Sequence, residues 1–317
     1  MVDNYLMSVR RSAFAGHFYP DSEQACRSEV QACLAAVDGM RATDSPDSEA
    51  ATLRQALRDG RQIALGGIVP HAGWICSGAV AAEVLAVLCQ RRDLDTVVIF
   101  GAAHRLMSKK AVLWAQDAWA TPLGEMAIDD QLANAVLAAS QEVEEDPEAH
   151  RIEHSIEVQV PFIQYLAPSV RLLPILVPHL APAPAIGLAV AEQARLLDRQ
   201  VVFVGSTDLT HYGPRYGFAP KGFGPEGFAW AKTQNDRRLL ELACRMEADR
   251  IVPEAKRHQN ACGAGAVAAT IAACQRSGAT RGVLLRHTTS AEVLQDRYGP
   301  MNDTVGYAGI VFAGPVV

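Results

Sequence analysis

The stretch IALGGIVPHAGWICSG, residues 63–78, combines a strand, a histidine and the start of a helix. Its first seven residues are apolar or glycine, which is typical of a strand buried on both faces of a parallel sheet. Pro70 cannot donate to a strand ladder, so the strand should end there. The Ala-rich run after Gly78 predicts a helix. His71 therefore stands just past the carboxyl end of a buried strand, where open α/β sheets bind their ligands.

The same arrangement recurs after three further apolar runs, so that four of the nine histidines stand within five residues of a predicted strand end. One isolated loop histidine is usually structural, but the repetition predicts that these side chains form one site. The further runs are 96–101, 171–177 and 201–206, and the histidines that follow them are His104, His179 and His211.

The composition is that of a globular protein without a polyanionic partner. Of 317 residues, 49% are hydrophobic and 20% charged, and the net charge is -6 with no block of Lys or Arg. This argues against binding to nucleic acid or to an anionic membrane surface. No secretory signal follows Arg10 and Arg11, and no run approaches the ~20 apolar residues of a membrane span. The seven cysteines contain no C-x-x-C pair, which favours reduced thiols in a cytoplasmic protein.

We expect residues 1–317 to form a single α/β domain. Its central sheet should be mostly parallel or mixed, with helices on both faces. Residues 38–50 are predicted to be a mobile loop and residues 142–148 an acidic loop. The Gly/Pro-rich residues 213–228 are predicted to be a loop that serves as a flap over the site. A long helix should follow it, to about Met246. The strands that should complete the sheet are 282–289 and 305–313.

The segment 150–166 carries two further candidates. In a helix, His154, Glu157 and Val158 would lie on one face. Glu153 and Glu157 are equally consistent with a solvated face. We take His154 and Glu157, together with His179, as candidate substrate-binding residues.

Cys262, Asp208 and His211 are candidates for chemistry. Cys262 stands at the start of a predicted helix, a position that lowers a thiol pKa, although a buried structural cysteine is the commoner case. Two histidines with a thiolate or carboxylate can hold a catalytic metal. Asp208 either orients a neighbouring imidazole or caps a turn, and His211 has the pKa range of a proton-transfer group.

Taken together, the motifs resemble the Memo family in their order along the chain. The resemblance spans about residues 12–313. The motifs are Ala15-Gly16-x-Phe18-Tyr19-Pro20, Pro70-His71-Ala72-Gly73, Gly101-x-x-His104, His154-Ser155-Ile156-Glu157, Ser206-x-Asp208-x-x-His211 and Cys262-Gly263.

The resemblance implies a fold similar to class III extradiol dioxygenases, which are non-haem iron enzymes. By that comparison His71, His104 and Cys262 match metal-binding positions, and His211 matches an acid–base histidine. It also implies a functional link with AMMECR1-type and radical SAM proteins, since microbial members are often labelled protein B of that system. The chain departs from many relatives at three positions, which leaves the substrate open: Trp74, Arg105 and Gln159.

Three functions remain open on this basis. The first is a metal-dependent oxidoreductase that uses Fe(II), with zinc or copper as alternatives, on a small molecule for which an aromatic compound is the first candidate. The second is a metal- or ligand-binding scaffold without turnover, because fold does not establish activity. The third is hydrolysis by a zinc-bound water or by Cys262, for which no G-x-S-x-G or H-E-x-x-H signature is present.

Overall fold

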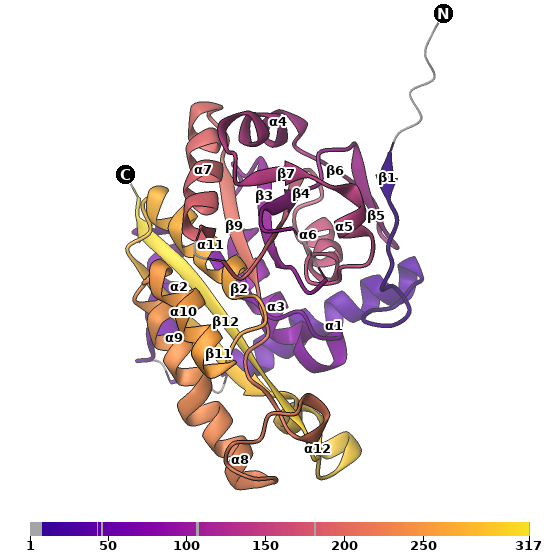
Figure 1. Cartoon of the computed structure of the whole chain (residues 1–317), viewed down its shortest axis with the longest axis vertical. Coiled ribbons are helices and arrows are strands. Elements are labelled where there is room, and N and C mark those ends of the chain that lie inside the picture. The colour runs from indigo at the N-terminus through magenta and orange to yellow at the C-terminus, as the bar shows by residue number, and fades with distance from the viewer. Residues whose placement is uncertain (1–7, 43, 46, 106–107, 181, 317) are drawn as a thin grey trace, which may run out of the picture.

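A computed structural model describes residues 8–42, 44–45, 47–105, 108–180 and 182–316 (Figure 1). Within these ranges, a nine-stranded sheet has the order β10-β12-β2-β9-β3-β8-β4-β7, and β11 also pairs with β12. The four predicted strands that precede histidines lie together at its centre and run parallel, as expected for apolar runs buried on both faces. They are β2 (Gln62–Val69), β9 (Val201–Ser206), β3 (Thr96–Ala102) and β8 (Arg171–Val177).

Antiparallel strands complete both sides of this parallel centre, so the sheet is mixed. The two C-terminal strands are present, as predicted, and a small three-stranded sheet lies beside the main one. The outer strands of the main sheet are β12 (Thr304–Pro315), β11 (Arg281–Thr289), β10 (His211–Tyr212), β4 (Ala111–Leu113) and β7 (Val143–Glu145). Those of the small sheet are β1 (Val9–Arg10), β5 (Ala118–Thr121) and β6 (Gly124–Ala127).

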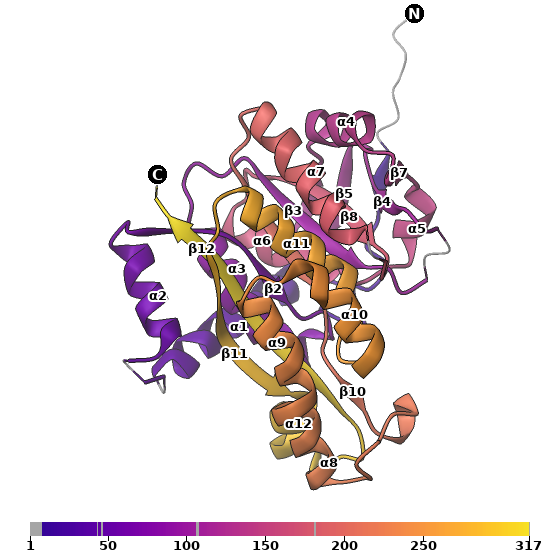
Figure 2. The ribbon, with the colours of Figure 1, turned by 60° about the vertical axis from the view of Figure 1, so that its left-hand side comes forward.

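Helices cover both faces of the main sheet, as predicted (Figures 1 and 2), and each face has its own apolar core. Cys26 and Cys33 lie in one of these cores, on the buried side of α1 (Glu23–Ala42). One face carries α4 (Asp130–Ala139), α7 (Ala183–Leu196), α9 (Arg237–Cys244), α10 (Ala248–His258) and α11 (Ala264–Arg276). The other carries α1 (Glu23–Ala42), α2 (Glu49–Arg58), α3 (Trp74–Leu88) and α6 (Val160–Leu166).

Two predicted loops are shorter than expected. The loop assigned to residues 38–50 loses its first part to α1, which continues to Ala42, and its last part to α2, which begins at Glu49. Ser48 caps α2 by accepting a hydrogen bond from the backbone N–H of Ala51, a start signal that the polar composition masked. The acidic loop at 142–148 contains β7 and the start of α5 (Pro147–Arg151).

The Gly/Pro-rich loop and the helix after it also differ from the prediction. Helix α8 (Pro225–Trp230) begins inside residues 213–228, because proline is favourable in the first helical turn. The long helix expected to run to about Met246 is instead interrupted by a π-helix, η3 (Ala231–Asp236), before α9. Helix α12 (Ser290–Tyr298) connects the two C-terminal strands along the chain.

The predicted helical face of His154 and Glu157 is wrong. Helix α5 ends at Arg151, and His154 lies in a turn before the 3-10 helix η1 (Glu157–Gln159). Ile152, the C-cap of α5, leaves the helical conformation, and the backbone becomes helical again only at Ile156, so no continuous helix joins His154 to Glu157. His154 and Glu157 consequently face different surroundings.

Candidate metal centre

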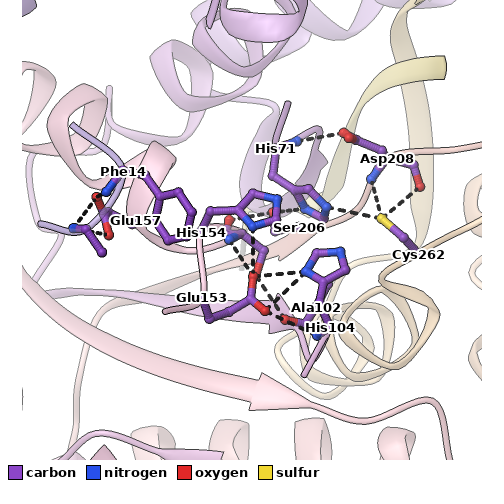
Figure 3. A network of polar contacts seen from close by, with 12 residues as sticks. Phe14, His71, Ala102, His104, Glu153, His154, Glu157, Ser206, Asp208 and Cys262 are labelled. Carbon is purple, nitrogen blue, oxygen red and sulfur yellow. Dashed lines mark hydrogen bonds and ion pairs between the residues drawn. The ribbon is translucent and has the colours of Figure 1, made fainter. Parts of the chain in front are cut away.

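Three histidines from separate parts of the chain converge at the carboxyl ends of the central strands (Figure 3). His71 follows β2, His104 follows β3, and His154 lies in the turn before η1. One ring nitrogen from each lies within 4.8 Å of the other two. The ring centroids are 5.1 Å apart for His71 and His104, 5.2 Å for His71 and His154, and 4.8 Å for His104 and His154. This spacing suits three imidazoles around one metal ion.

Ser206, the last residue of β9, fixes the orientation of the His71 ring. Its hydroxyl donates to the backbone carbonyl of Ser155 at 2.7 Å, so its oxygen is left to accept from Nδ1–H of His71 at 2.9 Å. The neutral imidazole then carries its lone pair on Nε2, the nitrogen that faces Cys262. This is the arrangement in which an imidazole binds a metal through Nε2.

Glu153 orients His104 and was not recognised from the sequence. Its two carboxylate oxygens lie 3.0 and 3.1 Å from Nδ1 of His104, and one lies 3.4 Å from Nδ1 of His154. It also accepts from the backbone N–H groups of His104 at 3.2 Å and Ser155 at 2.9 Å. Glu153 is buried, so the solvated face considered for it is wrong. Its place directly before His154 was the one signal in the sequence.

Burial and the Glu153 charge set the protonation of the three rings. Burial lowers the pKa of His71 well below its ordinary value and that of His154 to about 4. His104 is the most exposed of the three; partial desolvation opposes its protonation, but the hydrogen bond and charge of Glu153 outweigh this and raise its pKa. His71 and His154 are therefore neutral at pH 7 and have a lone pair to offer a metal.

Cys262 lies beside this group and contacts His71. Its Sγ is 3.1 Å from Nε2 of His71 and accepts from the backbone N–H of Asp208 at 3.3 Å. Gly263 is the N-cap of α11, so the predicted helix start is confirmed. The expected low thiol pKa is wrong, because burial and the neighbouring Asp208 raise it and outweigh the helix N-terminus.

Asp208 accepts hydrogen bonds from the backbone N–H groups of both His71 and Cys262. Its Oδ1 accepts from the backbone N–H of His71 at 2.8 Å, and its backbone carbonyl accepts from the N–H of Cys262 at 3.2 Å. Among the described residues, Ser206 and Glu153 rather than Asp208 bond the ring nitrogens of His71 and His104. Burial raises the pKa of the Asp208 carboxyl to about 7, so it can exchange a proton near neutral pH.

His179 and His211 line a pocket of about 360 Å³ that has Cys262 in its wall. His179 donates from Nε2 to the carbonyl oxygen of Cys262, and burial lowers its pKa. His211 donates from Nδ1 to the carbonyl oxygen of Leu209 at 3.1 Å, and burial lowers its pKa too. Their predicted roles, substrate binding for His179 and proton transfer for His211, stay predictions. The other residues of the pocket are Tyr216, Phe218, Ala255, Lys256, Gln259 and Ala261.

Glu157 belongs to a separate buried network on the far side of His154 (Figure 3). Its carboxylate pairs with Arg10 at 2.7 Å and accepts from the hydroxyl of Tyr19 at 2.8 Å. It also accepts from the backbone N–H of Phe14 at 2.8 Å, whose ring centroid lies 5.4 Å from that of His154. These contacts occupy both oxygens, so they give no support to substrate binding by Glu157. They hold the N-terminal segment against the site.

Two of the three departures from the family pattern brace the site. Gln159 donates from Nε2 to the carbonyl oxygen of Pro70 at 2.7 Å, directly before His71. Trp74 donates from its indole nitrogen to the carbonyl oxygen of Val158 at 2.9 Å. The third, Arg105, adds a positive charge that opposes protonation of His104. None of the three replaces one of the converging histidines.

Comparison with known proteins agrees with the motif order. Residues 10–311 match the family model described as "Memo-like protein". The chain belongs to the Memo family. A MEMO1 family protein of Methanopyrus kandleri is 34% identical over 307 residues, which cover 96% of this chain and 98% of that protein. A MEMO1 family protein of Methanothermobacter thermautotrophicus is 35% identical over 304 residues, covering 95% and 99%.

The Memo assignment rests on these sequences. A solved structure of an uncharacterized protein from Escherichia coli K12 aligns with a TM-score of 0.49 at 12% identity, covering 78% of this chain and 98% of that one. Across the described ranges of this Memo protein, we find no helix of the length and apolarity needed to cross a bilayer.

Proposed function

We propose that this Memo protein is a metal-dependent enzyme whose ion is held by His71, His104 and His154. The convergence of one nitrogen from each ring within 4.8 Å carries this proposal. Two are neutral at pH 7, and Ser206 and Glu153 engage Nδ1 of His71 and His104, which leaves Nε2 for a metal. Metal-binding histidines typically donate their second ring N–H to an acceptor oxygen such as a carboxylate, as His104 does to Glu153.

Cys262 is the third ligand that the family resemblance implies, and the geometry favours His154 over it. Among the described contacts of Sγ, the only partner within the histidine group is Nε2 of His71. A raised thiol pKa also disfavours the thiolate, which is the form that binds metal. The proposed ligand set therefore excludes the thiol of Cys262, which lies beside His71.

We propose Fe(II) as the ion, with zinc and copper as the alternatives. Imidazole suits all three metals, so the donor set fits the ion without selecting it. Bound iron would supply a redox-active Lewis acid for oxidation of a small molecule by O₂. The neutral imidazole of His211 offers Nε2 as a proton acceptor, since Nδ1 donates to Leu209.

The pocket beside Cys262 is where we propose that the small molecule binds. The rings of Tyr216 and Phe218 give it an apolar wall, which favours an aromatic ligand, and His179 and His211 supply polar contacts. Asp208 and His211 are the proposed proton-transfer residues. Tyr216 and Phe218 belong to residues 213–228, so the predicted flap remains part of this proposal.

Metal titration of matched variants tests the proposal. We expect the metal-free wild type to bind one equivalent of Fe(II) or Zn(II), and His71→Ala and His154→Ala to lose at least tenfold in affinity. Cys262→Ser should keep wild-type affinity if its thiol is not a ligand. His17→Ala is the control, because His17 is exposed and outside the group. Equal affinity in His154→Ala and wild type would remove His154 from the site.

The alternative is a metal- or ligand-binding scaffold without turnover. Consumption of O₂ by the iron-loaded protein with a panel of catechols distinguishes the two functions. Stable metal binding without O₂ uptake across the panel would favour the scaffold. The functional link to AMMECR1-type and radical SAM proteins is proposed from the family resemblance alone, and co-purification of the three recombinant proteins tests it.

A further inference from the structure

A π-helix lies against the segment that carries His211. The element η3 (Ala231–Asp236) interrupts the helix between α8 and α9. Single-turn π-helices inside α-helices occur frequently at functional sites. Here the insertion ends in two consecutive polar residues that are both fully buried, Asn235 and Asp236. Buried polar side chains are costly unless they are bonded, so their partners show what the π-helix does.

Both side chains bind Thr210, the residue directly before His211. Oδ1 of Asp236 accepts from the backbone N–H of Thr210 at 2.9 Å, and Nδ2 of Asn235 donates to Oγ1 of Thr210 at 3.0 Å. The remaining polar atom of Thr210, its carbonyl oxygen, accepts from the N–H of Gly306 at 3.1 Å. Thr210 is buried and is therefore held at each of its three polar atoms.

Because Thr210 is held in place, the hydrogen bond between its two chain neighbours, Leu209 and His211, is held in place as well. Nδ1 of His211 lies 3.1 Å from the carbonyl oxygen of Leu209, two residues earlier. A carbonyl only accepts, so the neutral imidazole must carry its proton on Nδ1 and its lone pair on Nε2. Leu209 is itself anchored, since its N–H donates to the carbonyl of Gly306 at 2.8 Å.

The same π-helix also holds the segment 258–260, which leads to Cys262. Nδ2 of Asn235 also lies 3.0 Å from the carbonyl of His258, and Nδ2 of Asn260 donates to the carbonyl of Asn235 at 2.9 Å. Asn260 stands two residues before Cys262. The second oxygen of Asp236 lies 3.0 Å from Nε2 of His287 on β11, which ties the π-helix to the sheet.

We propose that Asn235 and Asp236 are positioning residues that set the tautomer of His211. By holding Thr210, they keep the Leu209 carbonyl in reach of Nδ1–H and so present Nε2 as a proton acceptor toward the pocket. The inference rests on the proposed function only in giving His211 a proton-transfer role. The π-helix makes this positioning possible, because it brings Asn235 and Asp236 to the same buried residue, Thr210.

Tautomer measurement by NMR on metal-free protein labelled with ¹⁵N-histidine tests this inference. Long-range ¹H–¹⁵N correlations distinguish Nδ1–H from Nε2–H, and the His211 signals are those missing from His211→Gln. We expect the Nδ1–H form to dominate in the wild type. In Asp236→Ala, the ratio of Nδ1–H to Nε2–H should fall about tenfold, the size expected for losing one hydrogen bond.

Conservative and control variants separate positioning from general stability. Asp236→Asn keeps an oxygen for the N–H of Thr210 and should restore the wild-type ratio. Lys232→Met removes an ion pair with Glu292 from the same π-helix and should leave the ratio unchanged. Thr210→Val removes Oγ1 without changing size and gives the answer if Asp236→Ala does not fold, since it should lower the ratio in the same direction.

An unchanged tautomer ratio in folded Asp236→Ala, or in Thr210→Val if that variant alone folds, would overturn the inference. A metal titration of the same samples keeps this result apart from the proposed function. None of the described hydrogen bonds of Asp236 reaches the three converging histidines, so Asp236→Ala should bind metal as the wild type does. Loss of metal binding in the wild type would refute the metal centre and leave the tautomer result standing.

Discussion

At the scale of single residues, the site depends on buried side chains that hold the histidines. Glu153 is the clearest case, because one carboxylate reaches His104 at Nδ1 and at the backbone and also lies near His154. Burial opposes its ionisation, but its contact with His104 lowers its pKa to about 2, so it is ionised at neutral pH. An ionised partner makes the imidazole a stronger ligand.

Replacing Glu153 by Gln should weaken metal binding about 10–100-fold. The amide oxygen can still accept from Nδ1–H of His104, but the negative charge that strengthens the imidazole is lost. Calorimetric titration with Zn(II) measures the change. Glu148→Gln is the matched control, since Glu148 is an exposed partner of Arg151 in the preceding helix α5. Identical affinities for wild type and Glu153→Gln would show that the carboxylate does not support the ligand.

His150 should make the fold sensitive to acid. Its ring is buried, Nε2–H donates to the carbonyl of Val112 at 3.0 Å, and burial lowers its pKa to about 3. An unfolded histidine binds a proton below about pH 6.5, whereas this one stays neutral, so unfolding takes up a proton in that window. The stabilisation is present above pH 6.5 and is lost as the pH falls from there toward 3, at about 1.4 kcal/mol per pH unit.

Urea denaturation at pH 7.5 and 5.5 measures this pH dependence. His150→Phe keeps an aromatic ring beside Trp114 and Trp119 but cannot titrate. We expect it to be less stable than the wild type at pH 7.5 by about 1–3 kcal/mol, because the Val112 carbonyl loses its donor. Its loss of stability between the two pH values should be about 1 kcal/mol smaller. The same loss in both proteins would exclude His150 as a source of the acid sensitivity.

At the scale of elements, strand β3 and the turn that carries His154 are packed in direct contact. A Cβ added to Gly101 would lie 2.9 Å from Oγ of Ser155 and overlap the side chain of Ile156. Both residues follow His154 directly. The glycine in this strand therefore decides how close the turn comes to the sheet, and with it where the His154 ring lies.

Gly101→Ala should destabilise the protein by about 1–3 kcal/mol, the usual cost of overpacking a core. It should also lower metal affinity, since the displaced turn carries one of the proposed ligands. Thermal melts and metal titration of the same sample measure both effects. Gly39→Ala is the control: apart from neighbouring residues of α1 itself, no atom lies within 4 Å of the added methyl group, and the change should stabilise the protein by about 0.5–1 kcal/mol. If Gly101→Ala changed neither the stability nor the metal affinity, the position of the turn would not depend on this glycine.

The elements also show what local sequence patterns can and cannot predict. Strands β2, β3, β8 and β9 were predictable because each contains a continuous apolar run. Strands β2 and β8 end before a proline and β9 ends at Ser206, whereas β3 continues one residue past Gly101. The π-helix was not, because its extra residue is stabilised by tertiary bonds to Thr210 rather than by a local signal. Pro161 marks the first turn of α6, but no local signal predicted the break after α5 that leaves His154 outside a helix.

At the scale of the whole molecule, a parallel centre gathers the ends of β2, β3, β8 and β9 at one edge of the sheet. This is why four histidines that follow strands could be assigned to one region from the sequence. Which of the four histidines would share one group of side chains could not be predicted from the sequence. His71 and His104 join His154, whereas His179 and His211 line the pocket beside Cys262, because the division depends on loop conformations set by distant partners such as Ser206 and Glu153.

The fold class was predictable at this scale because it needs only the order of strands and helices. The ligand set was not, since Cys262 and His154 both lie near His71, and distances of a few ångströms decide between them. A metal-loaded crystal structure in which Cys262 replaces His154 would return the ligand set to the one that the family resemblance implies.

Anomalous diffraction from crystals grown with Fe(II) under anaerobic conditions tests the central claim most directly. Data collected on both sides of the iron absorption edge locate the ion without assumptions about its ligands. We predict one peak, about 2.0–2.2 Å from a ring nitrogen of each of His71, His104 and His154. Absence of a peak between these three rings at saturating iron, or a peak elsewhere on the protein alone, would contradict the claim.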